Sequence, residues 1–122
     1  MISSITLIKN RYVKRIFNMN FYLFTVTVPN VEEGKKIARI LVESKLAACV
    51  NIINDISSVY RWKGEIQVDN EHLLLIKTTE NKVESLIQKI IAIHSYETPE
   101  CIGFKVEKGS QKYLNWIKDV VD

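Results

Sequence analysis

Apolar and polar positions repeat with two different periods along this chain, and the changes of period mark its elements. Residues 21–28 read FYLFTVTV, a β-branched and aromatic run that predicts a strand. Pro29 ends this strand because proline has no amide donor for the ladder. Asn30 then predicts the start of a helix that runs to about Lys45, with Glu33 placed as in a capping box.

The middle of the sequence carries two long strand-like runs joined by a tight turn. The first run extends over residues 47–62, and Lys63-Gly64 supplies the turn. Residues 65–69 then alternate, as in a half-exposed strand. Residues 73–76 are continuously apolar, as in a strand covered on both faces. Together these runs predict a long hairpin.

Two further helices and a fourth strand follow the hairpin. Asn81 with Glu84 predicts a second helix cap. Pro99 restricts the residue before it to extended geometry, which predicts a loop after this helix. Residues 101–107 predict a strand, and Ser110 predicts the cap of a last helix.

This order of elements favours an α+β fold, the ferredoxin-like βαββαβ sandwich with a C-terminal helix. The domain covers residues 21–122, and residues 1–20 form a basic N-terminal extension that we expect to be flexible. Both helices of the βαββαβ unit should cover one face of a mainly antiparallel sheet. The second and fourth strands take opposite edges, so Cys49 and Cys101 lie too far apart for a disulfide.

The length of the hairpin predicts an oligomer. An arm of about 12 residues spans about 40 Å at ~3.3 Å per residue, whereas a domain of about 100 residues has a radius of gyration of about 13 Å. The overhanging part carries Ile53, Ile56, Val59, Tyr60, Trp62 and Ile66. An apolar edge of this length favours pairing with another chain. The alternative is a strand break near Asn54-Asp55 that folds the arm back.

Composition and charge exclude several classes of protein. The chain has 122 residues, 47% of them hydrophobic, so one globular domain is expected. No apolar run reaches the ~18 residues of a membrane-spanning helix, so no membrane partner is expected. The net charge of +3 comes from the N-terminal extension, and residues 21–122 hold 13 basic and 14 acidic residues. A near-neutral domain argues against a nucleic-acid partner.

The extension bears on the cellular compartment. Residues 1–20 contain Lys, Arg, Ser and Asn but no acidic residue, which loosely resembles an organellar transit peptide. The preferred interpretation is a frayed terminus and a cytoplasmic protein, with organellar targeting as the alternative.

Few residues combine into a site with recognisable chemistry. His94 stands at a predicted helix end, three residues before Glu97, which suits a cation but fits a helix-capping histidine better on spacing alone. Cys49 lies in an apolar strand, where core packing is favoured. His72 is expected at the surface. There is no GxGxxG loop, nucleophile elbow or HExxH, so an enzyme with a self-contained active site is not expected.

Aromatic residues and one lysine are candidates for a ligand cleft or an interface. Tyr60, Trp62 and Trp116 are able to stack on a planar ligand, although such residues more often anchor protein interfaces. Lys77 ends an apolar strand, where it would meet an anion or extend its amine to solvent.

Five motifs in the same order resemble the CutA family of divalent-cation tolerance proteins. They are LAACVNI at 46–52, SVYRWKG at 58–64, IKTT at 76–79, HSYETPE at 94–100 and YLNW at 113–116. The resemblance covers about residues 21–121. It implies a ferredoxin-like fold, a tight homotrimer whose hairpins pair between subunits, and binding of copper and other divalent ions.

The resemblance also implies where a metal would bind, and where this chain departs from the family. Pro is usual at the position of Ser95, and some bacterial members have Cys at Val26 and His at Ile93. Of that copper-associated set only His94 is present. The implied ligands are therefore His94, supplemented by Glu97 or by Cys49 from a neighbouring subunit. Copper(II) is preferred because imidazole ligands and the Irving–Williams order favour it.

Three functions follow, in order of preference. The first is a non-catalytic homotrimer that binds divalent metal ions in metal-ion tolerance. The second is a small-molecule or anion sensor with an inter-subunit cleft lined by Tyr60, Trp62, Lys77, Tyr96 and Glu97. The third, an RNA-binding module, is disfavoured because the third strand has no stacking aromatic at residues 72–76.

Overall fold

The computed structural model describes residues 19–122, and its elements follow the predicted order. The prediction for the N-terminal extension falls almost entirely on residues 1–18, which lie outside the described residues. The elements are β1 (Phe21–Val28), α2 (Val31–Glu43), β2 (Cys49–Trp62), β3 (Glu65–Thr79), η1 (Glu80–Lys82), α3 (Val83–Ile93), β4 (Ile102–Val106) and α4 (Gln111–Val121). The α+β architecture is therefore confirmed.

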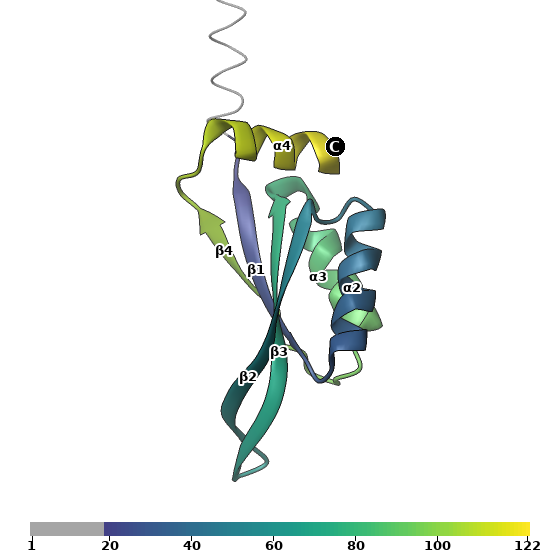
Figure 1. Ribbon diagram of the computed structural model, residues 1–122, viewed down its shortest axis with the longest axis vertical. Coiled ribbons are helices and arrows are strands. Elements are labelled where there is room, and N and C mark those ends of the chain that lie inside the picture. Colours follow the sequence, from purple (N-terminus) through teal and green to yellow (C-terminus); the bar gives the residue numbers. More distant parts are fainter. Residues whose placement is uncertain (1–18) are drawn as a thin grey trace, which may run out of the picture.

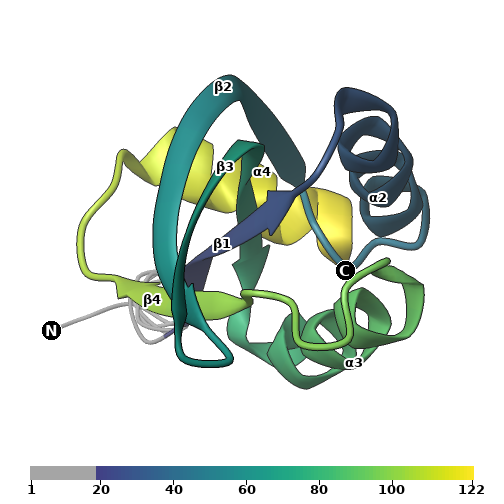
Figure 2. The same cartoon turned by 90° about the horizontal axis from the view of Figure 1, so that it is seen from below.

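The four strands form one antiparallel sheet in the order β2-β3-β1-β4. This order places β2 and β4 at opposite edges, as the sequence predicts, and both cysteines are free thiols in the described chain. Figures 1 and 2 show α2 and α3 together on one side of the sheet, while α4 lies across one end. The ferredoxin-like arrangement with an added C-terminal helix is present.

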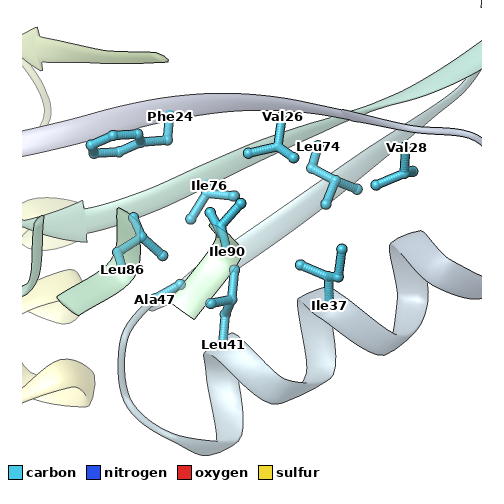
Figure 3. Packing of buried hydrophobic residues seen from close by; sticks show 10 residues of the cluster. All are labelled: Phe24, Val26, Val28, Ile37, Leu41, Ala47, Leu74, Ile76, Leu86 and Ile90. Atoms are coloured by element: carbon cyan, nitrogen blue, oxygen red, sulfur yellow. The ribbon is translucent and has the colours of Figure 1, made fainter. Parts of the chain in front are cut away.

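The main core lies between the sheet and the helices α2 and α3. Alternate residues of β1 point into it because successive side chains of a strand face opposite sides. Figure 3 shows these side chains meeting the apolar stripes of the two helices. The buried members are Phe24, Val26, Val28, Ile37, Leu41, Ala47, Leu74, Ile76, Leu86 and Ile90.

A second, smaller cluster anchors α4. Phe21, Ala48, Ile117 and Val121 are buried together there. Phe21 is three positions from Phe24 on the same strand, so it faces the other side of the sheet. The C-terminal helix therefore covers only one end of this second face, and the rest of the face is left without a helix in the described chain.

The hairpin of β2 and β3 extends well past the helices, as predicted (Figure 1). Pairing runs from Cys49 opposite Lys77 to Trp62 opposite Glu65, and the turn residues Lys63 and Gly64 have φ values of 50° and 81°. Positive φ at both central positions suits a tight hairpin turn.

At Asn54-Asp55, where the alternative placed a strand break, the hairpin has a β-bulge. Ile53 pairs with Leu73 and Ile56 with Glu71, so two residues of β2 oppose one residue of β3. Strand pairing resumes beyond the bulge, and the alternative of an arm folded back on its own domain is wrong.

Two local predictions at helix starts had different outcomes. The Asn30 side chain accepts a hydrogen bond from the Glu33 amide over 2.8 Å, which confirms the first cap, although α2 ends at Glu43 rather than at Lys45. The Asn81 cap is wrong, because α3 begins at Val83 without a side-chain cap.

The reason for this failure is a contact with a distant residue. The Glu80 amide donates to the carbonyl of Asn20, and the Asn20 side chain donates to the Glu80 carboxylate, both over 2.9 Å. These bonds hold Glu80 at the start of a short 3₁₀ turn. Asn81 lies inside that turn instead of in front of the helix.

Candidate functional site: an acidic and aromatic cavity

A cavity of about 660 Å³ lies between the far part of the hairpin and the loop that joins α3 to β4. The hairpin contributes aromatic, small and acidic residues beyond the bulge, and the loop contributes residues that follow His94. The lining residues are Ser58, Val59, Tyr60, Trp62, Glu71, Ser95, Tyr96, Glu97, Thr98 and Glu100. Three carboxylates and three aromatic rings are thus present, and no lysine, arginine or histidine of the described chain lines the cavity.

Glu71 is the most buried of these carboxylates, with 6% of its surface exposed. It is the first residue of β3 to pair with β2 beyond the bulge, opposite Ile56. Its Oε2 accepts a hydrogen bond from the Tyr96 hydroxyl over 2.7 Å. This contact joins the hairpin to the α3–β4 loop within the lining of the cavity.

Each of the two tyrosines of the cavity donates a hydrogen bond from its hydroxyl to a carboxylate, and each has a raised pKa. Burial, and then the hydrogen bond to Glu71, raises the pKa of Tyr96 above its usual range. The hydroxyl of Tyr60 donates to Asp69, and this bond is the main cause of the raised pKa of Tyr60. Both phenols therefore act as neutral donors at neutral pH.

His94 lies behind the cavity wall with both ring nitrogens in use. Nε2 is 2.8 Å from the carbonyl of Thr27, and Nδ1 accepts the backbone amide of Tyr96 over 3.0 Å. With Nδ1 as the acceptor, Nε2 is assigned as the donor to the Thr27 carbonyl. The imidazole is buried, and a metal ion would have to break one of these bonds to reach it.

Glu33 completes this support. Its Oε2 accepts the Ser95 amide over 3.2 Å and lies 3.5 Å from Nδ1 of His94. In a capping box the Glu33 carboxylate would accept a hydrogen bond from the Asn30 amide. Here it holds the start of the α3–β4 loop instead. His94 and Glu33 therefore fix the path of the residues that line the cavity.

The three predicted metal ligands do not meet within one chain. Glu97 is exposed at the cavity, His94 is buried behind it, and Cys49 stands at the start of β2, far along the strand from the cavity residues. The Cys49 thiol lies 3.8 Å from the side-chain oxygen of Asn51. Among residues 19–122, no group of three or more His, Cys, Asp and Glu side chains is arranged to hold a metal ion.

The predicted cleft residues divide between two places. Tyr60, Trp62, Tyr96 and Glu97 line the cavity. Lys77 and Trp116 lie instead near α4, where Lys77 donates to Asn51 over 2.7 Å and lies 5.6 Å from the ring centre of Tyr113. The ring of Tyr113 is 5.5 Å from that of Trp116.

Sequence reasoning missed the two carboxylates Glu71 and Glu100 at the cavity. A Glu-His pair within a polar strand has the pattern of a solvated face, and His72 was assigned to the surface for the same reason. In the structure His72 is buried, and it accepts the Asp55 amide at the bulge. Glu71 meets Tyr96 only because the folded chain places the hairpin beside the α3–β4 loop.

The protein-family model described as "CutA1 divalent ion tolerance protein" matches residues 22–120. The chain belongs to this family. The motif resemblance is thereby confirmed, and the fold agrees with it. No helix in the described part of this CutA chain is long and apolar enough to cross a membrane.

Individual CutA relatives show the same similarity. Protein CutA, chloroplastic, of Arabidopsis thaliana is 51% identical over 77% of this chain and 52% of its own length. The divalent-cation tolerance protein CutA of Thermus thermophilus is 43% identical over 77% of this chain and 91% of its own. The crystal structure of CutA1 from Oryza sativa superposes with a TM-score of 0.82 at 43% identity, covering 85% of this chain and 95% of that one.

The extent of these matches differs among relatives. The aligned region is only about half of the Arabidopsis protein, so the chain spans about half the length of that relative. The names of the family model and of the Thermus relative describe ion tolerance rather than a reaction.

Proposed function

We propose that this CutA chain is a non-catalytic homotrimer that binds divalent metal ions, with copper(II) preferred, in metal-ion tolerance. The observation that carries the proposal is the cavity wall with Glu71, Glu97 and Glu100 and no basic residue among the described lining. Such a surface concentrates cations by its field. The name of the Thermus relative, a divalent-cation tolerance protein, agrees with this direction.

The proposed ligands are Glu97, His94 and Cys49. Glu97 is exposed at the cavity and is free to approach an ion. His94 would exchange its bond from the Tyr96 amide for the metal, and Cys49 would come from another subunit. Imidazole and thiolate ligands favour copper over harder cations.

Calorimetric titration of Cu²⁺ tests the metal site. His94→Ala and Glu97→Gln should each weaken binding, while Glu84→Gln, which removes an exposed carboxylate from α3, should leave it unchanged. Isotherms of His94→Ala and Glu97→Gln identical to that of the unaltered protein would contradict the assignment.

The homotrimer is proposed from apolar surface that a single chain leaves exposed. Val59 and Val68 face each other across the hairpin and are 67% and 68% exposed, and Phe104 of β4 is 54% exposed. The strands β2 and β4 each have one neighbour in the described sheet, so each offers a free edge. A mass measurement under native conditions, with and without Cu²⁺, determines the assembly and its metal content together.

We propose the cytoplasm as the compartment, with organellar targeting by residues 1–20 as the alternative. The chloroplastic name of the Arabidopsis relative supports the alternative. Imaging of the full chain and of a chain starting at Met19, each fused at its C-terminus to a fluorescent protein, distinguishes the two. Organellar fluorescence that depends on residues 1–18 would favour targeting.

A second candidate function is small-molecule sensing at the same cavity. Its volume lies within the range of about 300–1,000 Å³ typical of ligand pockets. Three aromatic side chains offer apolar faces that a bare metal ion does not need. A thermal-shift panel of metals and metabolites separates the candidates, because stabilisation follows ligand affinity.

A further inference from the structure

We propose that the cavity binds a protonated organic amine that carries an apolar or aromatic body. This inference rests on the second candidate function, and it names the chemical class of the ligand. The sequence analysis allowed an anion as the ligand, whereas this inference assigns a cation.

The charge of the cavity determines the sign of the ligand. Glu71, Glu97 and Glu100 contribute three carboxylates, and no basic residue of the described chain lines the space. None of the three forms an ion pair with a side chain of residues 19–122. Lys77, the one cation expected in the cleft, is held by Asn51 near α4. An anion entering the cavity would meet repulsion without a compensating positive group.

Glu71 supplies the most specific part of the recognition. The residue is 94% buried, and the one hydrogen-bond partner of its side chain in the described chain is the neutral hydroxyl of Tyr96 on Oε2. A carboxylate accepts several hydrogen bonds, so Oε1 has acceptor capacity left. A buried carboxylate without a cationic partner is unfavourable. Among residues 19–122 the only fully buried side-chain N or O atom without a partner is Thr79 Oγ1, so Glu71 Oε1 is accessible to solvent, and an ammonium group there would supply a charge-assisted donor and a positive charge.

The aromatic residues determine the size and character of the rest of the ligand. Tyr60 and Trp62 are 41% and 46% exposed, and together with Tyr96 they line the cavity. Aromatic faces attract cations and pack against flat apolar groups. A space of about 660 Å³ is also far larger than a single metal ion requires. The carboxylates and aromatic rings that line this one cavity are therefore suited to an organic cation.

Calorimetric titration of the full chain with three probes of one skeleton tests the proposal. The probes are phenethylamine (a cation at neutral pH), phenethyl alcohol (neutral) and phenylacetate (an anion). We expect phenethylamine to bind roughly tenfold or more tightly than the alcohol, because only the amine forms a charge-assisted hydrogen bond. Phenylacetate should show no binding.

Matched variants locate the site. Glu71→Gln keeps an acceptor for Tyr96 and removes the charge, so it should weaken phenethylamine binding roughly tenfold or more and leave the alcohol unaffected. Glu97→Gln, at an exposed position, should weaken the amine by a smaller factor. Glu84→Gln on α3 removes the same charge elsewhere and should change nothing. Circular dichroism establishes that each variant is folded.

The possible outcomes distinguish failure of this inference from failure of the small-molecule sensing function on which it rests. If the alcohol or phenylacetate binds as tightly as the amine, the cavity is a ligand site but the assigned class is wrong. If Glu71→Gln is folded and binds the amine unchanged, the inference is overturned. If no probe binds, the inference fails, whereas the sensing function is decided by the thermal-shift panel and the metal proposal by the Cu²⁺ titration.

Discussion

The backbone amide of Asp55 donates a hydrogen bond to Nδ1 of His72 over 3.1 Å, across the β-bulge of the hairpin. Asp55 has a φ of 59°, and the histidine is 94% buried. Left-handed backbone in a residue other than glycine is unfavourable, so the bond helps to hold a conformation that the chain would otherwise leave. The residues beyond this point, Glu71 among them, form one wall of the cavity.

Replacing the acceptor should destabilise the protein. His72→Leu leaves the Asp55 amide without its partner, and we expect a loss of about 1–3 kcal/mol in the free energy of unfolding. Urea denaturation followed by circular dichroism measures it. His72→Gln, which retains an acceptor, should cost less than His72→Leu. Equal stability of His72→Leu and the unaltered protein would show that the bond contributes nothing to the bulge.

The contact between Tyr96 and Glu71 predicts a similar effect at the cavity. Tyr96→Phe removes the hydroxyl and leaves the buried carboxylate without its donor, at an expected cost of about 1–3 kcal/mol. The same urea experiment measures this loss. In the combined variant Tyr96→Phe with Glu71→Gln, the two effects should be non-additive because the residues share one bond. Additive losses would argue against the contact.

Tyr96 also predicts how stability depends on alkaline pH. Its pKa is raised in the folded protein, so the folded state favours the protonated phenol. The stabilisation is therefore complete below the unfolded pKa of about 10 and is lost as the pH rises through the higher folded value. Unfolding free energies between neutral pH and strongly alkaline pH should decline in that range, and less steeply in Tyr96→Phe. An identical pH profile in the variant would contradict the assignment.

Gly103 of β4 predicts a packing effect. A Cβ atom at this position would lie 2.4 Å from Cζ of Phe24, a buried core ring. Gly103→Ala should therefore cost about 1–3 kcal/mol through overpacking. Thermal unfolding detects the change. Phe24→Leu should relieve part of the penalty in the double variant, and the exposed substitution Glu107→Ala serves as a neutral control.

The exposed valine pair tests the homotrimer. Val59 and Val68 lie opposite each other on the hairpin, where a neighbouring subunit would cover them. Val68→Asp would place a charge in that interface and should weaken assembly roughly tenfold or more. Sedimentation velocity over a range of concentrations measures this. A trimer of unchanged stability would place the interface elsewhere, and a monomeric unaltered protein would refute the trimer itself.

The amino-acid sequence by itself determined the order of the elements, the long hairpin with its Lys63-Gly64 turn, and the helix starts at Asn30 and Ser110. The Ser110 side chain indeed accepts the Tyr113 amide. These features depend on interactions within a few residues, such as alternation, turn conformation and capping, which a linear pattern contains.

The tertiary structure alone decided which side chains meet at the cavity. Asn81 lost its predicted role because Asn20 binds Glu80, and Glu71 gained its role because Tyr96 reaches it from a loop 25 positions away in the sequence. His72 is buried between Val28 of β1, which it faces in the sheet, and Asp55 of the bulge, whose amide it accepts. Each of these outcomes is a contact between segments far apart in the chain, and local pattern carries no information about how such segments are placed in space.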